Sequence, residues 1–106
     1  MIIEHALLPV LPDRTEEFEA AFDRARHIIS AMPGFRSLSL SRCVEAPATY
    51  LLLVEWERLT DHTEGFRGSP EYLEWKRLLH HFYEPFPTVR HFDPVPAGAA
   101  DPAKPQ

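Results

Sequence analysis

The stretch from His62 to Trp75, HTEGFRGSPEYLEW, gathers side chains that can transfer protons, donate hydrogen bonds and wall an apolar pocket. His62 is a candidate general base, because imidazole is the side chain that ordinarily titrates closest to neutral pH. The Tyr72 hydroxyl can donate to a ligand oxygen or to a nearby carbonyl. Phe66 and Trp75 can line a pocket or fill the core. The stretch therefore predicts either the wall of a site or the ordinary start of a helix.

Four residues outside this stretch can contribute to the same site. His5 shares an apolar strand face with Ile3 and Leu7, where a histidine is either a structural core group or a base. His80 lies at the edge of the apolar stripe of a predicted helix and can face a cavity. The last two, the hydroxyl-bearing Tyr83 and the strand residue Trp56, can each line a pocket or pack in the core.

The six histidines do not predict a metal site. His80 and His81 are adjacent, so one helix cannot direct both side chains at the same ion. No two histidines are separated by three residues, the spacing that places a pair on one helical face. We therefore expect no bound metal.

Charge and composition exclude several classes of partner. The formal net charge of −5 and an isoelectric point of about 5.6 argue against nucleic-acid binding, which needs a basic surface. The N-terminal sequence MIIEHALLPV has an acid at Glu4 and no basic segment, so it predicts a strand and neither a signal peptide nor a membrane span. The single cysteine, Cys43, suggests a reducing cytoplasm. We expect neither a nucleic-acid nor a membrane partner.

Apolar periodicity predicts two helices, over about 14–32 and 70–84, and four strands, over 2–8, 35–44, 49–57 and 88–92. Asp13 is the expected N-cap of the first helix, and Ser69 with Pro70 marks the start of the second. Gly34 permits the left-handed turn that ends the first helix. A short helical turn, DHTEGF, is expected before the second helix.

The order strand, helix, strand, strand, helix, strand predicts an α+β protein with a ferredoxin-like βαββαβ fold, a four-stranded antiparallel sheet with two helices on one face. The strand over 49–57 is apolar on both sides, and Leu51 and Leu53 lie on the side that the helices leave open. A second copy packed sheet against sheet would cover them. We therefore expect a homodimer through the sheet face, a dimeric α+β barrel.

Residues 1–93 form the single predicted domain. The remaining segment, 94–106, is rich in proline and alanine with little to bury, and it predicts a flexible tail.

The run YLLLVEWERLTDHTEGFRGSPEYLEW resembles the antibiotic biosynthesis monooxygenase family. The resemblance covers about residues 1–93 and implies a small dimeric α+β barrel. Some members oxidise anthrone-type phenols or quinols with molecular oxygen, without metal or flavin, and others degrade haem. Haem-degrading members use Asn, Trp and His at positions that His5, Phe66 and Lys76 occupy here, so the resemblance does not imply haem degradation.

The resemblance implies a cofactor-independent monooxygenase that oxidises a small aromatic phenol or quinol with O2. Cofactor-free members carry an aromatic residue six positions before a Tyr, a spacing that Phe66 and Tyr72 match. His62 or His5 would then be the base, and Tyr72 and Arg67 would be donors. The other expected substrate-binding residues are Trp56, Phe66, Trp75, His80 and Tyr83. The alternative is a non-catalytic ligand-binding or stress-related dimer that uses the same pocket.

Overall fold

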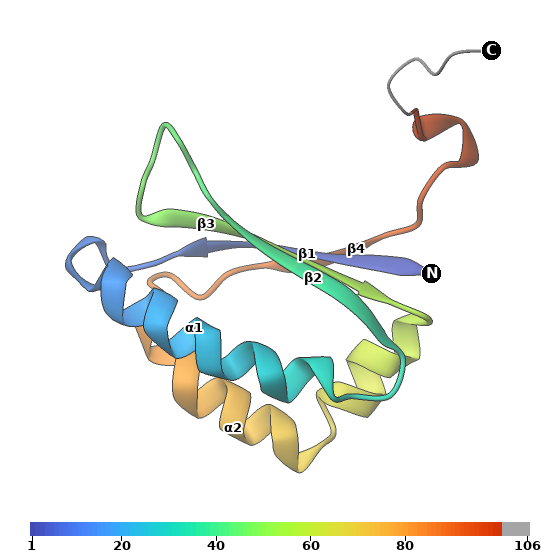
Figure 1. The fold of residues 1–106 in the computed structure, drawn as a ribbon, viewed down its shortest axis with the longest axis horizontal. Coiled ribbons are helices and arrows are strands. Elements are labelled where there is room, and N and C mark those ends of the chain that lie inside the picture. The colour runs from blue at the N-terminus through green and yellow to red at the C-terminus, as the bar shows by residue number, and fades with distance from the viewer. Residues whose placement is uncertain (101–106) are drawn as a thin grey trace.

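Alternating side chains form four strands, and apolar stripes at helical spacing form two main helices. The computed structural model describes residues 1–100. The elements are β1 (Ile2–Pro9), α1 (Thr15–Ser30), β2 (Phe35–Arg42), β3 (Thr49–Trp56), α2 (Pro70–Leu79) and β4 (Val89–Phe92). Figure 1 shows both helices packed below one face of the sheet, in the predicted order of elements.

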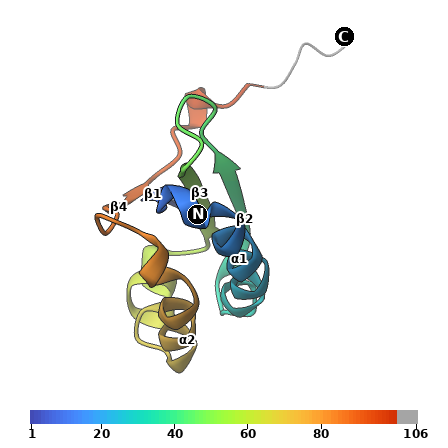
Figure 2. The same ribbon diagram turned by 90° about the vertical axis from the view of Figure 1, so that its left-hand side faces the viewer.

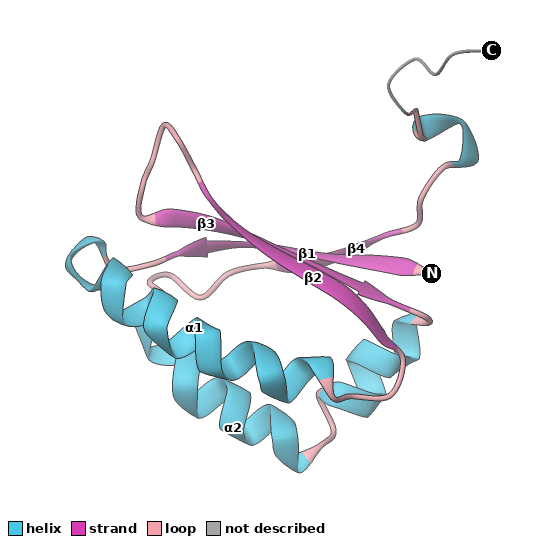
Figure 3. Cartoon of the chain, viewed as in Figure 1, coloured by secondary structure: helices cyan, strands magenta, loops and turns pink. Residues whose placement is uncertain are grey.

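The strands form one antiparallel sheet in the order β2-β3-β1-β4, so β1 and β3 are central (Figure 3). This topology, with both helices on one face, confirms the ferredoxin-like α+β fold. The register places Glu4 of β1 opposite Val54 of β3 on one side and opposite His91 of β4 on the other. Directly opposed residues point to the same face of a sheet, so Glu4 and His91 both face the helices.

The helix boundaries confirm one predicted cap and correct another. Ser69 caps α2, and its Oγ accepts a hydrogen bond from the backbone amide of Tyr72 at 3.2 Å. The expectation of Asp13 as the N-cap of α1 is wrong, because a 3-10 turn (Pro12–Arg14) precedes α1 and moves its start to Thr15. α2 is shorter than expected, since a 3-10 turn (His80–Phe82) follows Leu79.

Gly34 makes the turn between α1 and β2 with a positive φ of 83°, as the sequence predicts. A Cβ at this position would lie 2.2 Å from Cγ of Asp61, at the start of the short helical segment before α2. Gly34 is therefore needed both for its backbone conformation and for the close approach of that segment.

The core lies between the sheet and the helices, which Figure 2 shows end-on as two separate layers. Side chains from β1 and β3 meet those from α1 and α2 in a single buried cluster. Its apolar members are Ala6, Leu8, Val10, Phe18, Ala21, Phe22, Ala25, Ile29, Tyr50, Leu52, Val54, Trp56, Phe66, Trp75, Leu79 and Phe82. Burial of this apolar surface holds the two layers together.

The opposite face of the sheet has no covering layer in the described chain (Figure 2). Leu7 is 53% exposed and Phe92 48% exposed on that face. Leu51 and Leu53 are partly exposed there, whereas Leu52 between them is buried. One face of β3 is therefore covered by the helices and the other is left open, as the sequence predicts.

After β4 the chain leaves the sheet, and residues 93–100 are exposed (Figure 1). They contain one 3-10 turn, Pro96–Gly98. The predicted tail begins in this segment, and its last part, 101–106, lies outside the described residues. Among residues 1–100, no helix has the length and apolar character needed to cross a membrane.

We predict that Leu79→Ala in α2 lowers the free energy of unfolding by about 2–5 kcal/mol, because Leu79 is fully buried and its removal leaves a cavity. Leu73→Ala is the matched control in the same helix, with a 65% exposed side chain and an expected change within about 0.5 kcal/mol. Urea unfolding of both variants measures the difference. Equal losses would contradict the packing of α2 against the sheet.

Candidate functional site

The segment η2 (Asp61–Phe66) is a π-helical turn that directs His62 into the protein interior. The amide of Arg67 donates to the carbonyl of His62, five residues earlier, at 3.1 Å. His62 is 3% exposed and Phe66 1% exposed, so both side chains point beneath the sheet. Turns of this kind are frequent at functional sites.

A chain of polar contacts runs from Trp56 through Glu4 and His62 to His91. Trp56 donates from Nε1 to Oε1 of Glu4 at 3.0 Å, and Nε2 of His62 lies 3.3 Å from the same oxygen. On the other side of the ring, Nδ1 of His62 lies 2.7 Å from Nε2 of His91. The Glu4 carboxyl is 5% exposed, so these contacts replace most of the water that would otherwise solvate it.

Burial sets the charge states of Glu4, His62 and His91 in this row of polar contacts. It raises the pKa of the Glu4 carboxyl, although the Trp56 N–H and the charge of Arg67 oppose the rise. Burial, with Arg67 and His91, lowers the pKa of His62 to about 3. Burial and Arg67 also lower the pKa of His91. His62 is therefore a neutral imidazole at neutral pH, donating from one ring nitrogen and accepting at the other.

The His62 ring is fixed by aromatic neighbours as well. It stacks on Trp56, with ring centroids 5.5 Å apart and planes inclined by 14°. The Phe66 ring also lies beside it, with centroids 6.4 Å apart. The stacked ring has little freedom to turn. Its two nitrogens consequently keep separate partners, Glu4 and His91.

A cavity of about 390 Å³ lies between the sheet and α2. Both layers contribute to its wall: Glu4, Ala6, Leu8, Leu52, His62, Phe66, Arg67, Tyr72, Trp75, His80, Tyr83, Phe86, Pro87 and Val89. Its volume is in the range of pockets that hold small organic molecules. Since most of the lining is apolar or aromatic, the cavity suits a flat aromatic ligand with a few polar substituents.

Neutral polar groups form another part of the lining. Burial lowers the pKa of His80 to about 4 and raises the pKa values of the Tyr72 and Tyr83 hydroxyls. The His80 ring lies 5.9 Å from both tyrosine rings, measured between centroids. These three side chains therefore present uncharged hydrogen-bonding groups at neutral pH, while Arg67 carries the positive charge of the lining.

The structure brings together most of the residues that the sequence singles out. The cavity is lined by His62, Phe66, Arg67, Tyr72, Trp75, His80 and Tyr83. Trp56 is buried behind His62, to which it is stacked, and does not form part of the lining. Trp75 and Phe66 wall the cavity without filling it.

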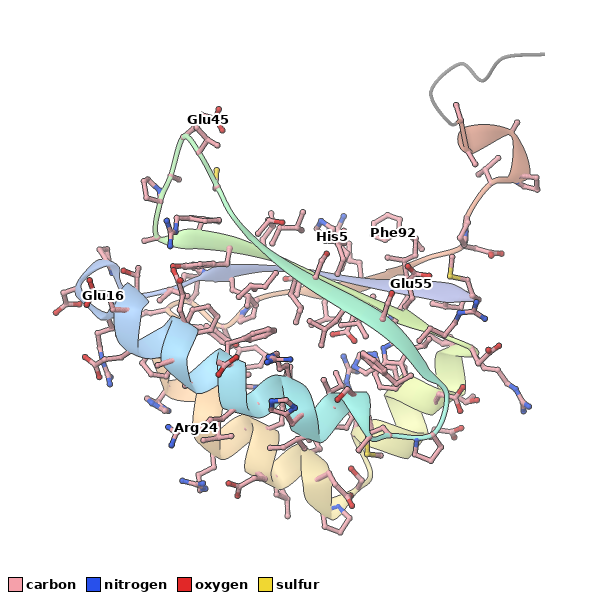
Figure 4. All side chains as sticks on the ribbon, in the orientation of Figure 1. His5, Glu16, Arg24, Glu45, Glu55 and Phe92 are labelled. Atoms are coloured by element: carbon pink, nitrogen blue, oxygen red, sulfur yellow. The ribbon has the colours of Figure 1, made fainter. Side chains whose placement is uncertain are left out.

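His5 is the exception, because it lies on the other face of the sheet (Figure 4). Its ring packs edge-on against Phe92, with centroids 5.6 Å apart. Both line a separate hollow of about 480 Å³, which includes Leu7 and Arg90 and which shares Phe86 with the cavity below. The sheet separates His5 from His62, so the two do not act on the same bound molecule.

Sequence reasoning missed Glu4 and His91 as site residues. Alternation along β1 places Glu4 on the face of Ala6 and Leu8, which the helices cover, and this buried position was the available signal. His91 lies two residues after Val89 in β4, so alternation places both on the same, more buried face of the sheet. The contact between His91 and His62 depends on the register of β4 and on the π turn, neither of which the sequence reveals.

Within residues 1–100, no three His, Cys, Asp or Glu side chains are grouped so that they could hold a metal ion. Glu4 and His91 contact opposite nitrogens of the His62 ring, an arrangement that cannot converge on one ion.

Comparison with known proteins places this chain and its fold in a family. The sequence model of the antibiotic biosynthesis monooxygenases matches residues 1–78. The chain belongs to this family. An uncharacterized Bacillus subtilis protein, YczJ, is 59% identical over 95 residues, which cover 90% of this chain and all of that protein.

Solved structures of the family share the architecture. A Bordetella bronchiseptica protein provisionally assigned to the antibiotic biosynthesis monooxygenases is 35% identical, with a TM-score of 0.85 over 89% of this chain and 96% of that one. A Streptomyces coelicolor monooxygenase, ActVA-Orf6, solved with Nanaomycin D, has a TM-score of 0.79 at 20% identity, over 96% of this chain and 92% of that one. The second likeness shows the fold alone.

The pKa of His62 in this family member generates a prediction for stability. The unfolded chain takes up a proton on His62 near pH 6.5, whereas the folded protein does so only near pH 3, so stability falls as pH decreases between these values. The raised pKa of Glu4 acts in the opposite sense, because it favours the folded state at low pH and loses that effect as pH rises. We expect His62→Gln to remove a slope of roughly 1.4 kcal/mol per pH unit.

Urea unfolding at pH 6.5 and pH 5 measures this slope in the wild type and in His62→Gln. Glu4 is present in both proteins, so its contribution largely cancels. His27→Gln, at an exposed position of α1, is the control and should keep the wild-type slope. Identical slopes in wild type and His62→Gln would show that His62 is not held neutral.

Proposed function

We propose that this protein is a monooxygenase that oxidises an electron-rich phenol or quinol with O2, and that Glu4 accepts the substrate's proton. The observation that carries the proposal is a buried carboxyl in the wall of an aromatic cavity, which accepts a hydrogen bond from the Trp56 N–H and lies 3.3 Å from Nε2 of His62. A carboxyl whose pKa is raised toward neutral pH is a suitable general base. Burial lowers the pKa of His62 to about 3, so its imidazole is a weak proton acceptor, and we propose Glu4 as the base in place of His62.

The chemistry requires only the substrate and oxygen. Glu4 removes a proton from the ring hydroxyl or from an activated ring CH2, and the resulting anion passes one electron to O2. The two radicals combine to form a C–O bond, and cleavage of the O–O bond releases water. An anthrone-type CH2 thereby becomes C=O, and a quinol becomes a hydroxyquinone. The substrate supplies all the electrons, so we propose no bound cofactor.

The other lining groups have roles that follow from their charge. Arg67 can stabilise negative charge that develops on the deprotonated substrate, and the neutral Tyr72 hydroxyl can donate to an oxygen of the ring. Phe66 and Trp75 provide flat apolar walls. An apolar wall excludes water, which would otherwise protonate the substrate anion again.

The family supports the reaction class, and the open cavity favours a small-molecule site over a purely structural module. A neighbour of the same fold was solved with Nanaomycin D as ligand. We propose an aromatic substrate for the present cavity, because aromatic side chains and a few polar groups form its lining.

We predict that Glu4→Gln lowers kcat for oxygen uptake with an anthrone or a hydroquinone by about 100-fold or more, because the amide cannot accept the proton. An oxygen electrode measures the rate. Glu71→Gln, at an exposed position in the first turn of α2, is the matched control and should retain wild-type turnover. Full activity in Glu4→Gln would remove Glu4 from the mechanism. Substrate binding without oxygen uptake in the wild type would favour the non-catalytic alternative.

We also propose that two copies pack through the open faces of their sheets. Leu7 and Phe92 expose apolar surface on this face, beside the partly exposed Leu51 and Leu53. Such a surface favours association, since pairing removes it from water. The proposal agrees with the dimeric α+β barrel implied by the sequence.

Leu7→Glu should convert this dimer to monomers, because it places two like charges in the paired faces without touching the core. Sedimentation velocity at micromolar concentration measures the change. Leu73→Glu, on the exposed side of α2, is the control and should remain dimeric. A wild-type monomer under these conditions would contradict the proposed assembly.

We propose that the protein resides in the reducing cytoplasm. Cys43 is a free, partly exposed cysteine, and its Sγ lies 3.7 Å from Glu45, with no disulfide in the described chain.

A further inference from the structure

The proposed oxidation involves Nε2 of His62, which lies beside Glu4, but gives no role to Nδ1. Nε2 lies 3.3 Å from Oε1 of Glu4, and Nδ1 lies 2.7 Å from Nε2 of His91. One ring thus joins two groups that can each gain and lose a proton. A neutral imidazole in this position can accept a proton at one nitrogen while it releases one from the other.

His91 leads away from the cavity. It does not contribute to the lining, and it belongs to β4, which is an edge strand of the sheet. His91 is only partly buried, whereas Glu4 and His62 are almost fully buried. The three side chains therefore form a path from the cavity wall to solvent at the sheet edge.

We propose that Glu4, His62 and His91 form a proton wire that connects the carboxyl group in the cavity with solvent at the edge of β4. Its use in catalysis rests on the proposed oxidation, but the wire itself does not. It would let Glu4 lose its proton while a bound aromatic molecule separates the carboxyl from the water in the mouth of the cavity.

The transfer moves protons only, and it leaves the protein with one more negative charge because one proton passes to water. The Glu4 O–H bond breaks as an N–H bond forms at Nε2 of His62, and the Nδ1–H bond of His62 breaks as one forms at Nε2 of His91. His91 is then an imidazolium and releases its Nδ1 proton to water. The wire ends with Glu4 as a carboxylate, His62 as the opposite neutral tautomer and His91 neutral.

The surrounding charges favour this path over one that stops at His62. Arg67 lies close enough to disfavour a positive charge on both His62 and His91, and burial adds to that effect most strongly at His62. Tyr72, from α2, also interacts electrostatically with Glu4. The positive charge is therefore least unfavourable on the more exposed His91, from which it passes to solvent.

The first experiment needs no substrate. Nitrogen-15 shifts of the His62 ring, followed from pH 4 to pH 9, report which nitrogen carries the proton. We expect the Nδ1–H tautomer while Glu4 is protonated and the Nε2–H tautomer once Glu4 has ionised, with both changes at one midpoint. Glu4→Gln should abolish the switch. A single tautomer throughout the titration of Glu4, or an imidazolium at His62, would overturn the wire.

The second experiment measures turnover in His91→Gln, whose amide can keep the contact with His62 but cannot relay a proton. We expect kcat to fall about 100-fold with KM unchanged, the low end of the range lost when a proton-transfer group is removed. Added imidazole should restore kcat, as it would not for a merely structural defect. His27→Gln, on the exposed side of α1, is the control.

The outcomes separate the two proposals. Unchanged kcat in His91→Gln, or a loss that imidazole does not restore, overturns the wire and leaves the oxidation standing. Absence of oxygen uptake in the wild type overturns the oxidation, and the His62 tautomer measurement then decides the wire alone.

Discussion

The structure depends on a carboxyl group buried on the covered face of a central strand. An isolated carboxyl in this place would destabilise the fold, because burial removes the water that solvates it. Trp56 and His62 supply polar contacts to Glu4, and His91 supplies one to His62 in turn. Every buried polar side-chain atom in the described chain has a partner. The sheet can therefore carry a proton-accepting group into an otherwise apolar interior.

Three separate features of the backbone set this arrangement. Antiparallel pairing places Glu4 beside His91, and the π turn of η2 turns His62 inward between them. Asp61, at the start of η2, accepts a hydrogen bond from the amide of Arg58 at 3.0 Å and packs against Gly34. The loop after α1 thus helps to position η2. A side chain at position 34 would displace Asp61 and, through η2, the imidazole that contacts the carboxyl.

The sequence predicts the architecture well because its signals are local. Alternation in β3, the Ser69 cap and the turn at Gly34 each specify structure within a few residues, and all three are observed. The part of the cavity lining that α2 contributes, Tyr72 and Trp75, follows from helical periodicity. The polar chain was not predicted, because it joins residues 4, 62 and 91, which only strand register and an irregular turn bring together. His5 was favoured over its neighbour Glu4 by residue type, although alternation points Glu4, and not His5, toward the helices.

The segment between α2 and β4 borders both hollows of the molecule. Phe86, which is 61% exposed, and Pro87 line the cavity under the sheet and also the hollow on the open face. These two side chains therefore form part of the boundary between the open face and the cavity on the covered face. A molecule bound on the open face would contact the same two side chains that border the cavity on the covered face.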